Sequence, residues 1–130
     1  ENAKIINITV PVSQEYWMPL AYVTSKAAQN AMTFAFGHQF KKDKSKKQIF
    51  AVMPGAVATD LNGAKVGDSP FVKSPEETAQ MISKFIFDDK NHNAKIINFD
   101  GTIYDNYEPG LRNKVIKDVA KNGLKRKFKK

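Results

Sequence analysis

The chain has 130 residues, of which 42% are hydrophobic and 26% charged, as expected for one globular domain with a modest core. The formal net charge of +8 is concentrated at one end, because residues 111–130 carry nine Lys or Arg and one acid while the preceding residues are balanced. The absence of cysteine excludes disulfides and thiolate metal sites. No apolar run reaches the roughly 18 residues of a membrane span, and no signal-peptide pattern opens the sequence, so we expect no transmembrane segment.

Three short apolar runs predict β-strands: AKIINIT at residues 3–9, QIFAVM at 48–53 and AKIINFD at 94–100. Continuous apolar runs, in place of an alternating pattern, are typical of strands covered on both faces, as in a parallel sheet. The near identity of the first and third runs is interpreted as shared strand composition, because a repeat architecture needs more copies.

Two helices are predicted between these runs. The first covers residues 22–41, with apolar residues around most of its circumference, so we expect it to be buried on more than one side. The lysine-rich segment KKDKSKK ends it and is interpreted as a solvated turn. The second helix begins at Ser74, which can cap it, with Pro75 in the first helical position and Glu77 closing a capping box.

The order strand–helix–strand–helix–strand, with long crossovers, predicts right-handed βαβαβ units and an α/β layer fold. Residues 104–130 are predicted to add a basic C-terminal helical tail. A solvated helix is the simplest interpretation of this tail, with a subunit contact, an acidic membrane surface or a nucleic acid as alternatives. Because no basic patch is interleaved with aromatic residues, no specific nucleic-acid recognition is expected.

Tyr22 and Lys26 are the pair of residues that a fold alone does not require. Residues four apart on a helix share a face, about 5–6 Å from one another. An ammonium beside a phenol favours the phenolate, so Tyr22 could act as a general acid or base with Lys26 tuning it. Tyr and Lys at this spacing are also common on solvated helix faces, so the spacing alone does not decide between the two interpretations.

The surroundings of this pair resemble the short-chain dehydrogenase/reductase family, especially its carbonyl-reductase-like members of the C-factor and sniffer type. YVTSKAA matches the family's Tyr-x-x-x-Lys followed by small residues, MPGAVATDL matches Pro-Gly-x-[Val/Ile]-x-Thr-[Asp/Glu], and AKIINFDGT is similar to its last strand with the closing Asp-Gly-Thr. The resemblance implies that residues 1–103 form the C-terminal half of a Rossmann-type domain, ahead of the tail. It also implies a cytoplasmic oxidoreductase acting on a small carbonyl or alcohol.

The resemblance also assigns roles to individual residues. Tyr22 would give a proton to a carbonyl, or take one from an alcohol, while hydride moves from or to NAD or NADP. Lys26 would favour the phenolate of Tyr22 and hydrogen-bond the nicotinamide ribose. The remaining cofactor-binding residues would lie just past the second strand, where α/β sheets bind ligands: Pro54, Gly55, the main chain of Val57 and the hydroxyl of Thr59.

The family's catalytic serine has no clear equivalent in this sequence. Alignment on the first strand puts Val10 in its place, whereas counting back thirteen residues from Tyr22 gives Thr9. Thr9 is therefore the candidate hydroxyl donor to the substrate carbonyl, with Ser13 as a weaker candidate. A valine in that position would remove one hydrogen bond to the developing oxyanion.

The Gly-rich phosphate loop of the family is also missing, and no acidic residue closes a first βαβ unit to choose NAD over NADP. We expect the chain to hold only the nicotinamide side of the cofactor and to be incomplete and inactive alone. Its first strand would be an exposed edge in need of a partner, so we expect a homo-oligomer. The alternative is a non-catalytic half-domain that acts as a binding or assembly module.

Two other features carry weaker expectations. His38 and His92 have no carboxylate or second histidine at ligand spacing in the sequence, so no metal site is expected. The apolar residues 16–20 lie where the family's substrate pocket has a wall, which favours a non-polar substrate. Local packing accounts for these residues equally well.

Overall fold

The structure is a computed structural model that describes residues 2–12, 19–61 and 63–104. Its elements in chain order are β1 (Lys4–Ile8), α1 (Leu20–Lys42), β2 (Gln48–Met53), α2 (Pro75–Ile86) and β3 (Ile96–Asn98). The predicted basic tail, Ser13 and residues 16–18 of the predicted pocket wall lie outside the described residues.

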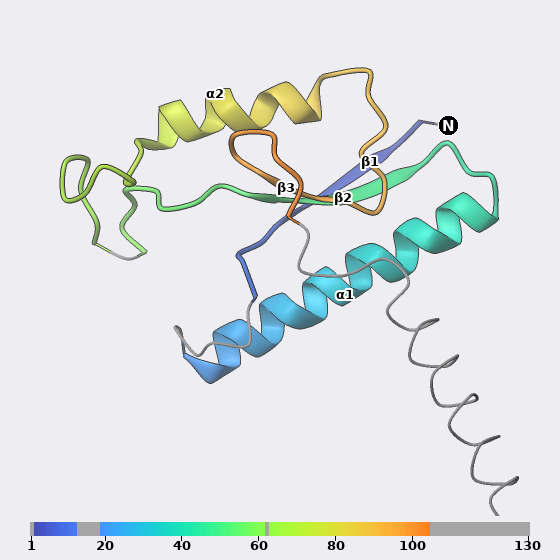
Figure 1. The fold of residues 1–130 in the computed structure, drawn as a ribbon, viewed down its shortest axis with the longest axis horizontal. Coiled ribbons are helices and arrows are strands. Elements are labelled where there is room, and N and C mark those ends of the chain that lie inside the picture. Colours follow the sequence, from blue (N-terminus) through green and yellow to red (C-terminus); the bar gives the residue numbers. More distant parts are fainter. Residues whose placement is uncertain (1, 13–18, 62, 105–130) are drawn as a thin grey trace, which may run out of the picture.

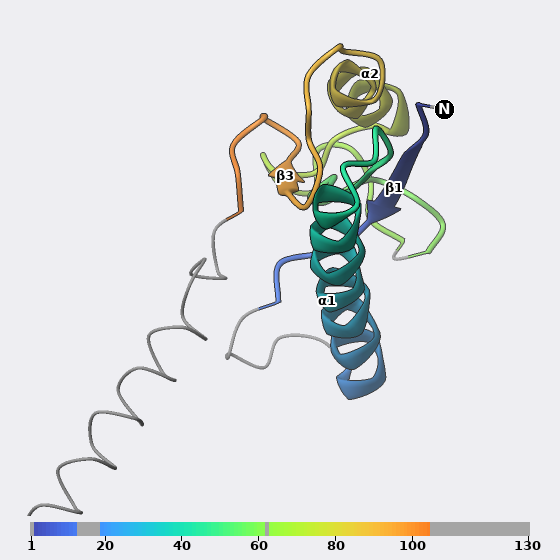
Figure 2. The same ribbon diagram turned by 90° about the vertical axis from the view of Figure 1, so that its right-hand side faces the viewer.

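The three strands form one parallel sheet in the order β1-β2-β3. Lys4 pairs with Gln48 at the start of the β1–β2 ladder, and Ala51 pairs with Ile96 in the β2–β3 ladder. Helix α1 lies on one face of the sheet and α2 on the other, so the fold has three layers (Figures 1 and 2). The predicted α/β layer fold with a parallel sheet is therefore confirmed.

The central strand β2 carries the core. Its side chains from Ile49 to Met53 are buried, and they divide between the two faces of the sheet. One face packs Phe50, Val52 and Ile97 against α2, while the other packs Ala51, Met53 and Ile96 against α1. A strand covered on both faces needs apolar residues at successive positions, and this explains the continuous run QIFAVM.

The expectation that α1 is buried on more than one side is wrong. Its buried residues are Asn30, Thr33 and Gly37, whereas Met32 is 44% exposed and Phe36 is 50% exposed. The sheet covers one side of the helix, where the fully buried residues are small or polar and Phe34 packs partly buried against the core. No helix in the described part of the chain is both long and apolar enough to cross a membrane.

Helix α2 starts where its sequence predicts. The Ser74 side chain caps the helix by accepting a hydrogen bond from the Glu77 amide at 3.1 Å, and Pro75 occupies the first turn. Two glutamates in that turn, Glu76 and Glu77, complement the positive end of the helix dipole.

Gly37 brings α1 unusually close to the segment that leads into β3. A Cβ at Gly37 would lie 2.6 Å from Ala94 Cβ, which no real pair of carbons tolerates. The Asn93 amide group fastens this contact, because its Nδ2 donates to Gly37 O at 2.7 Å and its Oδ1 accepts from Ile49 N at 3.1 Å. Ala94 itself has φ +59°, so β3 begins at Ile96, two residues later than the start of the predicted strand.

The expectation that His92 has no carboxylate at ligand spacing is also wrong. The chain turns back after α2 and places His92 Nε2 2.8 Å from Asp88 Oδ2, with Lys4 Nζ 3.7 Å from the other carboxylate oxygen. Two residues do not make a metal centre, and no cluster of three or more candidate ligands occurs within residues 2–12, 19–61 and 63–104. The pair instead links the turn after α2 to the start of β1.

Because of this ion pair, we expect the stability of the fold to depend on pH in the acidic range. Burial opposes ionisation of Asp88, but the hydrogen bond and charge of His92, the Lys90 amide and the charge of Lys4 together outweigh it and hold the pKa of Asp88 below its usual value. Such a carboxylate stabilises the fold above its unfolded pKa of about 3.9, and the contribution is lost as pH falls through the lower folded value. Urea denaturation should therefore show that the free energy of unfolding falls below about pH 4.

The Asp88→Asn variant should flatten this acid dependence, whereas substitution of its exposed neighbour, Asp89→Asn, should leave it as in the parent. If the parent and Asp88→Asn show the same slope of stability against pH between pH 5 and 3, the Asp88–His92 pair does not carry the effect.

Candidate active site

The carboxyl ends of all three strands lie at one edge of the sheet, because the strands are parallel. Helix α1 reaches this edge through Lys26, whose Nζ donates to Ile8 O at the end of β1 at 2.8 Å. Residues 54–59 follow directly from β2 at the same edge. In doubly wound α/β folds this is the edge at which ligands bind.

Tyr22 and Lys26 share one face of α1, as their spacing predicts. Lys26 Nζ lies 5.8 Å from the centre of the Tyr22 ring, and both side chains are half-buried. The same ammonium is 3.3 Å from Gln29 Oε1. Within the described residues the Tyr22 hydroxyl has no hydrogen bond, so a half-buried phenol lies beside a fixed ammonium with its own oxygen available.

The turn after β2 has an open backbone. Gly55 has φ +73° and is exposed, and a Cβ there would come within 3.0 Å of Lys73 Nζ and 3.1 Å of the Phe99 ring. A side chain at this position would be strained and crowded, so glycine leaves the main chain accessible. Val57 pairs with Lys73 in a short parallel bridge, and Thr59 is exposed. No hydrogen bond in the described part of the chain joins residues 54–59 to Tyr22 or Lys26.

Lys73 lies beside Gly55 at this edge of the sheet, a position that the sequence does not predict. It is only 9% exposed, and its Nζ lies 3.8 Å from the centre of the Phe99 ring, a close cation–π contact. Among the described residues it forms no ion pair. A buried ammonium beside Gly55 therefore adds positive charge to the turn after β2. The sequence around Lys73, which precedes the helix cap Ser74, does not indicate that this lysine is buried.

Thr9 is placed differently from the predicted substrate contact. It is 1% exposed, and its hydroxyl donates to Asn30 Oδ1 at 2.6 Å. Asn30 is fully buried on α1, and its Nδ2 has no hydrogen-bond partner in the described residues. In this arrangement Thr9 joins the end of β1 to α1, and its hydroxyl is shielded from solvent.

A parallel sheet with a helix on each face is similar to part of the Rossmann-like fold of short-chain dehydrogenases/reductases. The chain is similar to the NADPH-bound carbonyl reductase from chicken fatty liver, with 23% identity and a TM-score of 0.65 over 78% of this chain and 42% of that one. It is also similar to the carbonyl reductase Sniffer of D. melanogaster, with 26% identity and a TM-score of 0.59 over 77% of this chain and 40% of that one.

These likenesses confirm the resemblance inferred from sequence and the partial Rossmann-like fold. The chain spans only about two fifths of each of the two solved structures. No protein-family model matches it, and no curated protein does.

Proposed function

We propose that the chain is the catalytic portion of an NAD(P)-dependent oxidoreductase of the short-chain type, which reduces a small carbonyl or oxidises the corresponding alcohol. The observation that carries this proposal is the position of the Lys26 ammonium, held by Ile8 O and placed beside the Tyr22 ring at the carboxyl edge of the sheet. The two solved structures named above are both carbonyl reductases, and one of them holds NADPH.

In this proposal the Tyr22 hydroxyl donates its proton to the carbonyl oxygen during reduction and takes it back during oxidation. Lys26 has three N–H donors. One is used on Ile8 O and another lies toward Gln29, which leaves the third for a ribose hydroxyl. Thr9 is given a positioning role, since its bond to Asn30 holds α1 against β1.

The residues present fit the nicotinamide side of the cofactor. Gly55 offers an open backbone at the end of β2, and we propose that Pro54, Gly55, the Val57 main chain and the Thr59 hydroxyl line the nicotinamide and its carboxamide. When bound, the nicotinamide supplies or accepts the hydride. The sequence has no Gly-rich phosphate loop for the adenosine side, so we propose that a separate polypeptide segment provides those contacts.

The test is turnover by the protein as its source cells make it. Purified protein is mixed with NADPH or NADH and a panel of non-polar aldehydes and ketones, and cofactor oxidation is followed by absorbance. We expect carbonyl-dependent oxidation of one cofactor. A preparation that is folded but shows no turnover with either cofactor in either direction would overturn the proposal.

An assembly module is the second candidate, and the edge of the sheet favours it. Among the described residues, β1 has a strand on one side only, with Ile5 46% exposed and Ile8 45% exposed. Such an edge is a template for pairing with another chain. If assembly is the function, Ile5→Lys should shift the mass measured by light scattering to that of a monomer, while Tyr22→Phe should change nothing measurable.

A further inference from the structure

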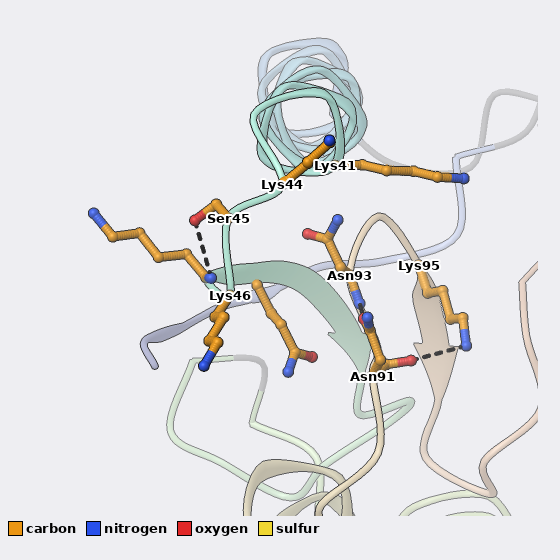
Figure 3. Close-up of a pocket in the computed structure, with 9 residues that line it drawn as sticks. Lys41, Lys44, Ser45, Lys46, Asn91, Asn93 and Lys95 are labelled. Carbon is orange, nitrogen blue, oxygen red and sulfur yellow. Dashed lines mark hydrogen bonds between the residues drawn. The ribbon is translucent and has the colours of Figure 1, made fainter. Parts of the chain in front are cut away.

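A cavity lies at the edge of the sheet opposite the candidate active site, where β2 and β3 begin. It has a volume of about 500 Å³ and is formed by the end of α1, the turn into β2 and the segment before β3. Figure 3 shows Lys41 and Lys44 on the α1 side, facing Asn91, Asn93 and Lys95 on the segment that leads to β3. We call it the lysine pocket after the five lysines that line it: Lys41, Lys44, Lys46, Lys47 and Lys95.

The charge of the lysine pocket is uncompensated. Its remaining lining residues are neutral and polar, and neither an acidic nor an aromatic residue is among them. The neighbouring carboxylate of Asp43 is engaged by Gln39 Nε2 at 2.8 and 2.9 Å. Five positively charged side chains line one hollow, so an anion bound there would be stabilised by the ammonium groups that turn toward it.

The backbone holds the shape of the lysine pocket. Lys44 has φ +53° and ends α1, with Ser45 N donating back to Phe40 O at 2.9 Å. On the other side Ala94, with φ +59°, lies against Gly37. These are the two non-glycine residues with positive φ in the described part of the chain, and both border the pocket. Left-handed backbone at such residues persists only where its surroundings enforce it.

Asn93 also fixes the walls of the lysine pocket, because its side-chain amide oxygen bonds to β2 and its amide nitrogen bonds to α1. Lys95 is brought into the pocket from far along the sequence, and its Nζ donates to Asn91 O at 3.1 Å. A solvated turn, the interpretation from sequence, therefore describes the lysine-rich segment incompletely. The structure adds a wall on the far side of an open hollow lined by exposed lysines.

We propose that the lysine pocket binds a compact polyphosphate anion, a small polar molecule that carries two or three phosphate groups. Ammonium groups bind phosphate oxygens by charge-assisted hydrogen bonds without demanding one orientation. The cavity has the size of a small-molecule site. Because no aromatic side chain lines it, a base would have no surface on which to stack. The phosphate groups would then be the part recognised. The site is at the opposite sheet edge from Tyr22 and does not depend on the proposed redox activity.

The test uses the full chain and inorganic tripolyphosphate as the probe, titrated by calorimetry at about 0.15 M salt, where exposed charges are largely screened. Amide shifts in ¹H–¹⁵N spectra should concentrate at residues 44–48 and 91–95. The variant Lys44→Asn/Lys95→Gln should bind at least about tenfold more weakly, since each removes a charged donor. Asparagine is chosen at position 44 because it tolerates positive φ.

The matched control is Lys65→Gln/Lys84→Gln, which removes the same charge from two exposed lysines outside the lysine pocket. It should change affinity by less than about twofold. Equal losses in both variants would show diffuse attraction, to which the basic residues 111–130 contribute, and would overturn the proposal.

A lipid headgroup could present the same chemistry, so vesicles of phosphatidylcholine with and without a phosphatidylinositol bisphosphate form a second arm. Binding of tripolyphosphate that depends on Lys44 and Lys95, without co-sedimentation with vesicles, supports a free ligand. Co-sedimentation without tripolyphosphate binding, or no binding in either arm, overturns the proposal that the lysine pocket binds a free polyphosphate. Circular dichroism of each variant establishes that the fold is retained.

Discussion

Replacing Tyr22 with phenylalanine should, under the proposed oxidoreductase function, lower turnover by about 10²–10⁴-fold, the usual contribution of a general acid or base. The substitution removes one oxygen and leaves the ring on which the Lys26 ammonium lies. Lys26 keeps its bond to Ile8 O, so the edge of the sheet and the cofactor contacts should be retained. Steady-state kinetics should therefore show a lower kcat with little change in the KM for the cofactor.

Tyr104→Phe is the matched control, because it removes the same oxygen from a tyrosine whose hydroxyl donates to Val12 O at 3.3 Å. It should leave turnover within about twofold of the parent, because in the proposed mechanism the Tyr104 hydroxyl transfers no proton. Turnover that survives Tyr22→Phe, or falls equally in both variants, would contradict the role of Tyr22 as proton donor.

Gly37→Ala should destabilise the fold by about 1–3 kcal/mol, the range for forcing an extra methyl group into a packed site. A Gly→Ala substitution in a helix normally stabilises the fold, by about 1 kcal/mol, so the expected change in stability has the opposite sign here. The added Cβ would meet Ala94 Cβ at 2.6 Å and Ala94 Cα at 2.8 Å. Urea denaturation of the parent and variant measures the difference.

Ala94→Gly provides the second arm of a double-mutant cycle. Glycine adopts the φ of +59° at this position without strain and removes one of the clashing atoms. Its combination with Gly37→Ala should therefore be less destabilised than the sum of the two changes, by a coupling of about 0.5–3 kcal/mol. A Gly37→Ala variant more stable than the parent would show that α1 and the segment before β3 can move apart freely.

Much of the fold could be predicted because its signals are local. β2 was predicted with its observed ends, since a strand covered on both faces is apolar throughout. Ser74 and Pro75 fixed the start of α2 through capping, which involves only neighbouring residues. The burial of α1 could not be predicted in this way. Its apolar circumference indicated two packed sides, but the described sheet ends at β1 and covers one of them.

The same distinction applies to the candidate active site. Tyr22 and Lys26 could be placed together because a helix fixes the positions of residues four apart. The position of Lys73 could not be predicted from sequence. Its burial depends on Phe99 and on the turn at Gly55, which lie near it only once the sheet has folded. Thr9 was assigned from spacing to Tyr22, whereas its bond to Asn30 depends on how α1 rotates over β1.

The parallel order of the strands has a consequence for the path of folding. Each pairing must close across a complete helix, and proteins dominated by such distant pairings fold more slowly than helical bundles. The bond from Lys26 to Ile8 spans 18 residues, whereas that from Ile49 to Asn93 spans 44, and shorter loops cost less entropy to close. We therefore expect α1 to dock on β1 early and β3 to join the sheet last. The surroundings of Tyr22 would then take shape before the lysine pocket does.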